Sequence, residues 1–173
     1  MLFRSSKIPL VAITGSNGKT TTKEIVASIL ATHLRSKKRL LMSQGNYNNN
    51  IGLPLSLLNI EKTQKFAVVE MGMNHKGEIS YLSKLARPDV AVITNIAEAH
   101  IEFFGSKKGI AKAKSEIFEG LKKNGIAIIN RDDEFYSLMK NAARTKNIIS
   151  FGLNKKADVY FLKSLRDRKS TRL

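Results

Sequence analysis

The chain of 173 residues is long enough for one domain of ordinary size, so a single hydrophobic core is expected. Its hydrophobic share of 42% and charged share of 25% are those of a globular protein, which excludes disorder for most of the length. The absence of cysteine excludes disulfides, thiolate metal sites and cysteine catalysis, while the net charge of +16 makes nucleic acid the first partner to consider.

The positive charge is spread over three clusters. They are Arg35 with Lys37, Lys38 and Arg39, then Lys107 to Lys114, then Arg166 to Arg172. No aromatic residues interleave with these clusters, as a platform for single-stranded nucleic acid requires. Nucleic acid is therefore not the expected main partner, and a non-catalytic basic binding module is kept as an alternative.

Short apolar runs alternate along the chain with segments of helical spacing. The first run, residues 10–14, ends at Gly15, and Gly18 opens a segment with Ile25, Val26, Ile29 and Leu30 at helical spacing. Further strands are predicted at residues 66–69, 90–94, 126–129, 148–151 and 158–162, and helices at 77–85, 107–123 and 133–143, the last capped by Asp132 or Asp133. The strands are continuously apolar, which suits a parallel sheet covered on both faces. The alternation predicts an α/β fold with a doubly wound, mostly parallel sheet.

The segment TGSNGKTTT, residues 14–22, lies between a predicted strand and a predicted helix, where backbone N–H groups and the helix dipole can face an anion. In a P-loop, Lys19 would reach the β- and γ-phosphates and the Thr20 hydroxyl would ligate Mg²⁺. The strict pattern is not met, because Ile13 stands where its first glycine belongs. The alternative is a glycine-rich turn with a capping threonine. The predicted nucleotide contacts are Gly15, Ser16, Asn17, Gly18, Lys19, Thr20 and Thr21.

Four stretches of the sequence resemble the Mur ligase family. TGSNGKTTTKE is similar to the ATP-binding loop of the family, and GNYNNNIGLP (45–54) is similar to its Asn/Gly loop. VVEMGMNHKGEI (68–79) resembles its metal-binding strand end, and TNIAEAHIEFFGSKKGIAKAKSEIF (94–118) resembles the segment that carries its histidine and modified lysine. The combination is most like the MurF members, which add D-alanyl-D-alanine to a UDP-N-acetylmuramoyl-tripeptide. The matches are spread through residues 8–163.

Glu70 follows the apolar run FAVV, so it would emerge at the carboxyl end of a strand, where open α/β sheets bind ligands. A carboxylate there can hold Mg²⁺, although by itself such a residue is more often a solvated strand end. The resemblance implies that Glu70 is a metal ligand together with Thr20. It also implies that His100 shares a second metal ion with Lys114.

Lys114 falls on the apolar side of its predicted helix. At 100° per residue, the apolar stripe consists of Ile110, Ala113, Ile117 and Leu121, and Lys114 lies within it. A buried ammonium needs a partner or must lose its charge, unless its long stem reaches the rim. The resemblance implies instead a carbamylated lysine, whose new carboxylate can ligate Mg²⁺.

Two asparagines complete the candidate site. The resemblance places Asn50 near the phosphates and the substrate, whereas Asn48 and Asn49 could simply be turn residues. Asn130, which ends the run IAII, matches the asparagine that reads adenine in the family. Arg131 follows it here in place of the small residue of the family pattern.

The resemblance implies ATP-dependent amide ligation with ATP and Mg²⁺ as cofactors. Lys19, Lys114 and His100 would be the catalytic residues, with the substrate carboxylate attacking the γ-phosphorus to give an acyl phosphate. The substrates would be UDP-N-acetylmuramoyl-tripeptide and D-alanyl-D-alanine. A related ligase, such as a folylpolyglutamate or cyanophycin synthetase, is an alternative against which EMGMNHKGEI argues.

The resemblance also implies the organisation of a fragment. Residues 1–163 would form the central ATP-binding domain and residues 164–173 a basic, disordered tail, with the N-terminal UDP-binding and C-terminal domains of the family absent. We then expect ATP binding without ligase activity, because closure of the third domain completes such a site. No secretion signal is visible and no apolar run approaches the roughly 18 residues of a membrane span, so a cytoplasmic monomer is expected.

Overall fold

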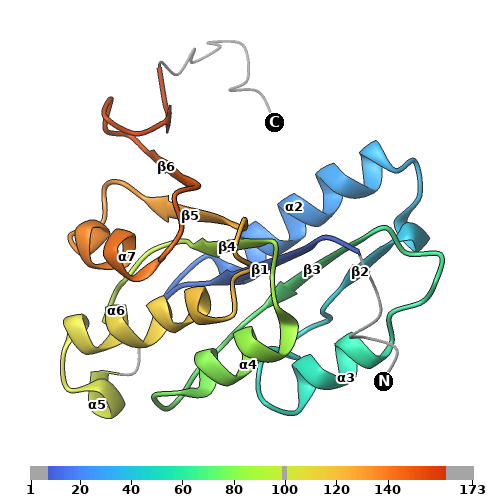
Figure 1. Ribbon diagram of the computed structural model, residues 1–173, viewed down its shortest axis with the longest axis horizontal. Coiled ribbons are helices and arrows are strands. Elements are labelled where there is room, and N and C mark those ends of the chain that lie inside the picture. Colours follow the sequence, from blue (N-terminus) through green and yellow to red (C-terminus); the bar gives the residue numbers. More distant parts are fainter. Residues whose placement is uncertain (1–7, 99–100, 163–173) are drawn as a thin grey trace, which may run out of the picture.

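The computed structural model describes residues 8–98 and 101–162 (Figure 1). Seven strands form one sheet in the order β2-β3-β1-β4-β5-β6-β7, and every neighbouring pair is parallel. Their bounds are β1 Leu10–Thr14, β2 Leu40–Met42, β3 Phe66–Glu70, β4 Val90–Ile93, β5 Ile126–Asn130, β6 Ile148–Gly152 and β7 Val159–Tyr160. The predicted α/β class with a doubly wound parallel sheet is confirmed.

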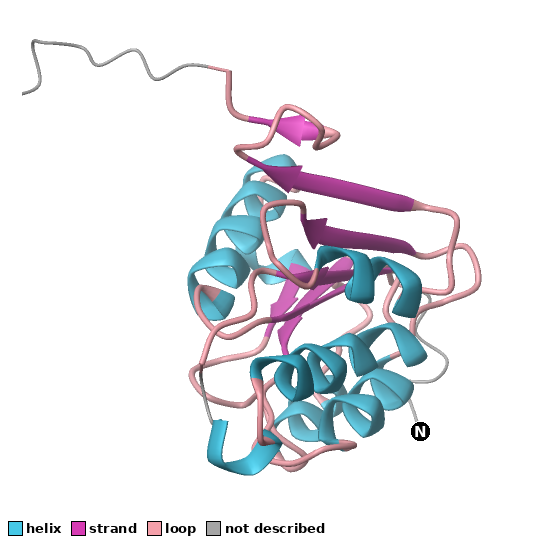
Figure 2. Ribbon diagram, turned by 90° about the vertical axis from the view of Figure 1, so that its left-hand side faces the viewer, coloured by secondary structure: helices cyan, strands magenta, loops and turns pink. Residues whose placement is uncertain are grey.

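Helices cover both faces of this sheet. They are α2 Lys19–His33, α3 Gly52–Leu58, α4 Glu78–Ala86, α5 Ile101–Phe104, α6 Lys107–Ser115 and α7 Tyr136–Ala142, with 3-10 turns η1 Lys37–Arg39 and η2 Glu116–Glu119. The long helix α2 lies on one side of the strands, and α3, α4, α6 and α7 lie on the other (Figures 1 and 2). No helix among the described residues is long and apolar enough to cross a membrane.

Alternate residues of the central strands pack into two separate cores. Ile13, Val68 and Val92 point to the α2 side, where they meet Val26 and Leu30. The opposite face carries the larger core, which includes Ala12, Val69 and Ile93 together with the apolar sides of α3, α4, α6 and α7. Because both faces are buried, the strands read as continuous apolar runs.

The sheet order reverses at β1. The chain runs from β1 out to the edge strand β2, returns to β3, and then crosses β1 to reach β4. Ile13 pairs in register with Glu70, and Thr14 with Ile93, so β1, β3 and β4 end at the same edge. Ligands of open α/β sheets bind at such a switch point, at the carboxyl ends of the strands.

The helix predicted over residues 107–123 is shorter than expected. The α-helix ends at Ser115 and continues only as the 3-10 turn η2. Here the Ser83 hydroxyl of α4 donates a short hydrogen bond to the Ile117 carbonyl and accepts one from Gly120 N at 3.1 Å. A Cβ at Gly120 would collide with the Ser83 backbone, so α4 and η2 pack too closely for the helix to continue.

The predicted cap of the last helix is also wrong. Helix α7 begins at Tyr136 with Phe135 as its N-cap. Asp133 is used elsewhere, because its carboxylate accepts from Ile96 N at 2.7 Å and from Phe135 N at 2.9 Å. Asp132 accepts from Leu153 N and Asn154 N beyond β6. Both carboxylates therefore tie loops together at the carboxyl edge rather than opening the helix.

Other differences concern short elements. The strand predicted over residues 158–162 is reduced to Val159–Tyr160, and the sequence did not predict β2, α3 or α5. Helix α2 forms as expected, but Ile25 and Ile29 are exposed and the small side chains of Ala27 and Ala31 are buried instead. Small residues allow the backbone of α2 to approach the sheet closely.

Candidate active site

The phosphate loop, residues 15–18, joins the end of β1 to the first turn of α2. Gly15 has φ 152°, and a Cβ there would lie 3.2 Å from the backbone N of Thr94 and would collide with its side chain. Gly18, with φ 77°, is the N-cap of α2. Glycine is required at Gly15 by both its φ and its close contact. The loop therefore brings backbone N–H groups and the positive end of the α2 dipole to one place, as a phosphate site requires.

The segment after β4 holds this loop in position. Asn17 N donates to Asn95 Oδ1 at 3.0 Å, and Asn95 Nδ2 donates to Asn17 O at 3.1 Å. Ser16 N donates to Asn95 O at 2.9 Å, and the Thr94 hydroxyl donates to Asn17 O at 2.7 Å. Sequence reasoning assigned no role to Thr94 or Asn95, although both stand in the quoted stretch TNIA. They fix the shape of the loop from a part of the chain about 80 residues away in sequence.

Lys19 and Lys114 share one acceptor in this loop. Lys19 Nζ donates to Gly15 O at 2.9 Å and to Ser16 O at 3.2 Å, while Lys114 Nζ donates to Gly15 O at 2.9 Å. Lys114 is only 4% exposed, so the side chain is buried rather than extended to the rim. Burial, followed by the charge of Lys19, lowers the pKa of Lys114 to about 7. Near neutral pH a large fraction of Lys114 is therefore an uncharged amine.

Glu70 closes the other side of the site. It is the last residue of β3 and is 3% exposed, so it is not a solvated strand end. Thr20 Oγ1 donates to Glu70 Oε2 at 2.8 Å, and Asn48 Nδ2 donates to Glu70 Oε1 at 2.9 Å. The contact with Thr20 joins the start of α2 to the end of β3. The sequence left open that Asn48 is simply a turn residue, and the structure shows that its side chain contacts Glu70.

The oxygen donors at this point fit a hard divalent cation. The Glu70 carboxylate and the Thr20 hydroxyl lie together beside the phosphate loop, and such oxygens are ligands that Mg²⁺ prefers. Within the part of the chain that the structure describes, no three His, Cys, Asp or Glu side chains gather as a metal site. A cation here would therefore complete its ligand set with water or with phosphate oxygens. His100, expected to be catalytic and a metal ligand, lies outside the described residues.

A buried lysine that the sequence analysis missed supports the same edge. Lys23 is completely buried on α2, and its Nζ donates to Ser43 O at 2.8 Å and lies 3.4 Å from a Glu24 carboxylate oxygen. Ser43 Oγ in turn accepts from Glu70 N at 3.1 Å. The helical spacing of Lys23 from Ala27 and Ala31 was the signal that could have revealed its burial.

Asn130 lies farther along the edge, at the end of β5. Its Nδ2 donates to Thr94 O at 3.1 Å, and its Oδ1 accepts from Asp132 N at 2.9 Å. It lines an open pocket of about 510 Å³ together with three aromatic residues, Phe151, Tyr160 and Phe161. Ligand pockets are typically lined by such apolar and aromatic residues, and adenine recognition by Asn130 stays a prediction.

The remaining predicted positions are exposed. Thr21 lies on α2 and Asn50 lies just before α3, both facing solvent. Asn49 is a turn residue, since its Oδ1 accepts from Ile51 N at 3.1 Å and Gly52 N at 2.8 Å. The structure gives no contact that decides the roles predicted for Thr21 and Asn50.

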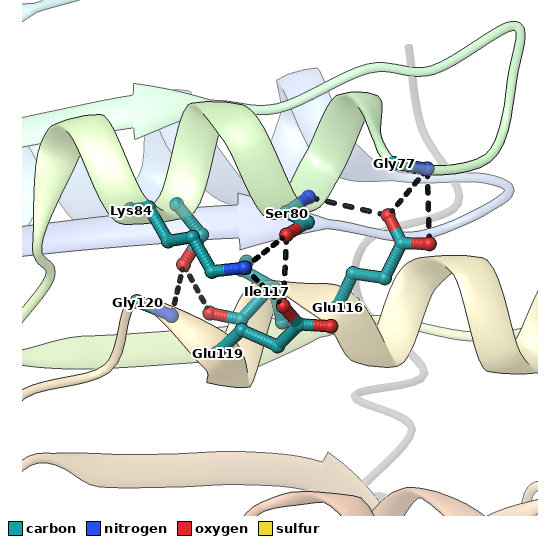
Figure 3. A network of polar contacts seen from close by, with 8 residues as sticks. Gly77, Ser80, Lys84, Glu116, Ile117, Glu119 and Gly120 are labelled. Carbon is teal, nitrogen blue, oxygen red and sulfur yellow. Dashed lines mark hydrogen bonds and ion pairs between the residues drawn. The ribbon is translucent and has the colours of Figure 1, made fainter.

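A polar network joins the two segments that follow Glu70 and Lys114 (Figure 3). The Glu116 carboxylate accepts from Gly77 N at 3.0 Å and from Ser80 N at 3.2 Å, at the first turn of α4. Burial raises the pKa of Glu116, opposed by these two hydrogen bonds. Nearby, Glu119 accepts from the Ser80 hydroxyl at 2.8 Å and pairs with Lys84 at 2.6 Å. The network braces α4 against the end of α6.

The sequence matches a family model described as the Mur ligase middle domain over residues 13–172. A UDP-N-acetylmuramoyl-tripeptide–D-alanyl-D-alanine ligase of Haemophilus influenzae is 52% identical over 122 residues, which cover 70% of this chain and 27% of that protein.

Two solved structures are also similar to this chain. MurF from Acinetobacter baumannii matches with a TM-score of 0.83 and 41% identity over 91% of this chain and 33% of that one. MurF ligase from Thermotoga maritima, solved in complex with ADP, matches with a TM-score of 0.75 and 41% identity over 88% of this chain and 34% of that one. The chain thus spans about a third of the length of these relatives.

Proposed function

The chain belongs to the Mur ligase family, and from this premise we propose that it binds Mg²⁺-ATP at the shared edge of β1, β3 and β4. The observation that carries the proposal is the contact between Thr20 Oγ1 and Glu70 Oε2 at 2.8 Å. It joins the phosphate loop to a buried carboxylate, so that one site offers both an anion cradle and oxygen ligands for a cation. A glycine-rich turn with only a structural role would not need a buried carboxylate beside it.

Each residue of the edge has a proposed role at the triphosphate. The backbone N–H groups of residues 15–18 and the α2 dipole would hold the phosphates, and Lys19 would leave its carbonyl acceptors to meet the β- and γ-phosphates. Glu70 and Thr20 would hold Mg²⁺, with His100 and Lys114 at a second ion. Bound Mg²⁺ supplies charge neutralisation of the phosphates. Thr21 and Asn50 would contact nucleotide and substrate, and Asn130 would contact adenine.

Lys114 is the proposed site of carbamylation. With its pKa lowered to about 7, Lys114 has the neutral amine that can attack CO₂ at neutral pH. A bond forms between Nζ and the carbon of CO₂, one proton leaves the nitrogen, and the product is a carbamate with one negative charge. The buried amine thereby becomes an anion beside Lys19, and the repulsion that a protonated Lys114 would exert on Lys19 is replaced by attraction.

The complete reaction that we propose is that of the relatives, amide ligation in peptidoglycan synthesis. A carboxylate of a UDP-linked muramoyl tripeptide would attack the γ-phosphorus and release ADP, and the amine of D-alanyl-D-alanine would then displace phosphate from the acyl phosphate. The described edge would position the triphosphate and stabilise its charge. ATP and a UDP-linked substrate place this reaction in the cytoplasm. For a chain that spans about a third of its relatives, nucleotide binding is the part to test.

The test is calorimetric titration of Mg²⁺-ATP into the purified chain and into its Lys19→Ala variant. Lys108→Ala, which removes an exposed lysine of α6, is the matched control for lost charge. We expect saturable, metal-dependent binding in the wild-type chain and in the control, and a dissociation constant at least about 10-fold higher in Lys19→Ala. Absence of binding in all three proteins, or equal affinity in all three, would refute the proposed nucleotide site.

A further inference from the structure

The loop between β2 and α3 lies directly against the carboxylate end of Glu70. Within it, Asn48 Nδ2 donates to Glu70 Oε1 at 2.9 Å, and Asn48 O accepts from Gly72 N at 2.8 Å. Asn48 therefore makes one side-chain contact and one backbone contact with the segment that ends β3. The two contacts fix its position relative to Glu70 on both sides.

The Asn48 side chain packs closely against the backbone of Gly72. A Cβ at Gly72 would lie 3.0 to 3.2 Å from the side-chain Oδ1, Cγ and Nδ2 atoms of Asn48, which is closer than ordinary van der Waals contact. The absence of a side chain at Gly72 thus leaves the space that the Asn48 amide occupies. Close packing against Gly72 and the hydrogen bond to Glu70 together define the position of the Asn48 side chain.

The start of the same loop is attached to the end of β3 as well. Ser43 N donates to Val68 O at 3.1 Å, and Ser43 Oγ accepts from Glu70 N at 3.1 Å. The ammonium of Lys23, which is fully buried, donates to Ser43 O at 2.8 Å. Both ends of residues 43–48 are therefore hydrogen-bonded to β3 and the residues that follow it, including Glu70 itself.

The partners of Glu70 are chemically unusual for a buried carboxylate. Its two oxygens accept from neutral groups, the Asn48 amide and the Thr20 hydroxyl, and none of the ion pairs between described residues involves it. Neutral donors orient the carboxylate without neutralising its charge. The negative charge and the remaining lone pairs are left for a cation.

We propose that Asn48 is a positioning residue that holds the Glu70 carboxylate in the orientation that binds the divalent cation. This inference rests on the proposed Mg²⁺-nucleotide site and adds to it a residue outside the ligand set. Partners that orient a metal ligand typically contribute 10-fold to 100-fold in metal affinity. The amide is suited to this task because its charge does not change with pH.

Three variants test the role of Asn48. Asn48→Ala removes the donor, Asn48→Asp replaces it by an acceptor facing a carboxylate, and Gly72→Ala displaces the amide without changing it. Asn46→Ala, which alters an exposed side chain of the same loop, is the matched control. Calorimetry gives the dissociation constant for ADP with Mg²⁺ and with EDTA. Electron paramagnetic resonance gives the dissociation constant for Mn²⁺ alone.

We expect Asn48→Ala to raise the dissociation constants for Mg²⁺-ADP and for Mn²⁺ by about 10-fold, with Asn48→Asp affected more and Gly72→Ala less. ADP affinity in EDTA should stay within about twofold of wild type, which a merely structural defect would not allow. Equal metal affinity in Asn48→Ala and wild type overturns the inference, as does an equal loss in EDTA. If the wild-type chain binds Mn²⁺ but no nucleotide, the proposed function fails while the Mn²⁺ comparison still decides the role of Asn48.

Discussion

The two ends of the carboxyl edge are built differently. Where β1, β3 and β4 end, charged side chains are buried and are held by distant segments: Glu70 and Lys114 are 3% and 4% exposed. Where β6 and β7 end, large apolar side chains face solvent: Leu153 is 75% exposed and Phe161 is 57% exposed. Ser150 pairs there with Asp158 eight positions on, and Asp132 accepts from Leu153 N and Asn154 N.

This difference separates two parts of nucleotide recognition. At the first end, the positions of Gly15 and Glu70 are fixed by contacts with distant segments, which is the preorganisation that phosphate binding uses. At the second end, the pocket beside Asn130 has solvent-exposed apolar side chains in its walls, such as Leu153 and Phe161. We therefore expect that substitutions at the first end change both stability and binding, and that those at the second end change stability little.

The largest effect is expected at Gly15. Gly15→Ala places a Cβ against Thr94 at φ 152°, so the phosphate loop and the β4 end cannot both keep their positions. We expect a loss of about 3 kcal/mol in the free energy of unfolding, measured with urea, together with loss of Mg²⁺-ATP binding.

Gly18→Ala is the control for this substitution. Gly18 also has a positive φ, of 77°, but apart from its own neighbours along the chain no described residue lies within 4 Å of the added Cβ. Its cost should be about 1 kcal/mol. Equal costs at the two glycines would contradict the view that the contact with Thr94 sets the loop.

The next effect is a dependence of stability on pH. The pKa of Lys114 is about 7 in the folded chain and 10.5 in a model compound, so the unfolded state binds more protons between these values. The penalty for burying the cation is complete below pH 7 and disappears as the pH rises through this window. Lys114→Met should therefore lower the slope of unfolding free energy against pH, between pH 7.5 and 9, by about 1 kcal/mol per unit.

Urea titrations in buffer free of bicarbonate measure this slope, because carbamylation would otherwise replace the amine. Lys112→Met changes an exposed lysine of the same helix and should keep the wild-type slope. A slope that Lys114→Met leaves unchanged would show that Lys114 is not buried as a titrating amine.

A smaller loss is expected from the network of Figure 3. Glu116→Ala leaves Gly77 N and Ser80 N without their acceptor at the start of α4. We expect a cost of about 1 to 2 kcal/mol in urea unfolding, because backbone donors lose a charged partner. Glu61→Ala, at an exposed position far from this network, should cost less than about 0.5 kcal/mol. A similar loss of unfolding free energy in Glu116→Ala and Glu61→Ala would show that the network does not stabilise the fold.

The smallest effect on stability is expected where β6 and β7 end. Phe161→Ser removes an exposed ring beside β7 and should change the free energy of unfolding by less than about 0.5 kcal/mol. If Phe161 forms part of the adenine pocket, the same variant should weaken ATP binding more than it weakens binding of inorganic triphosphate. A loss of stability above about 2 kcal/mol would break the contrast between the two ends.

Much of this edge was predictable because it follows from periodicity. The continuous apolar runs predicted the parallel strands of the central sheet, and the position of TGSNGKTTT predicted the phosphate loop. The helical spacing of Lys114 predicted that its side chain is buried. The same spacing argument applies to Lys23 and was not used. Strand β2 was not predicted and strand β7 was predicted too long, because a strand of two or three residues is too short to show a recognisable apolar pattern.

The contacts of Asn48 could not be predicted in this way. They depend on the path of an irregular loop and on the space at Gly72, neither of which has a period in the sequence. The early end of α6 had a similar cause, since it follows from the approach of Ser83 on another helix. Local pattern predicts elements, whereas contacts between distant segments decide where the polar atoms meet.

The most direct test of the central claim is the change in backbone amide NMR signals when Mg²⁺-ADP is added to the ¹⁵N-labelled chain. We expect the largest shifts on residues 15–20, with smaller ones at residues 94–97 that hold the loop. Shifts centred instead on the groove between α2 and β2, lined by Thr32, Arg35 and Gln44, would contradict it, and so would the absence of any shift.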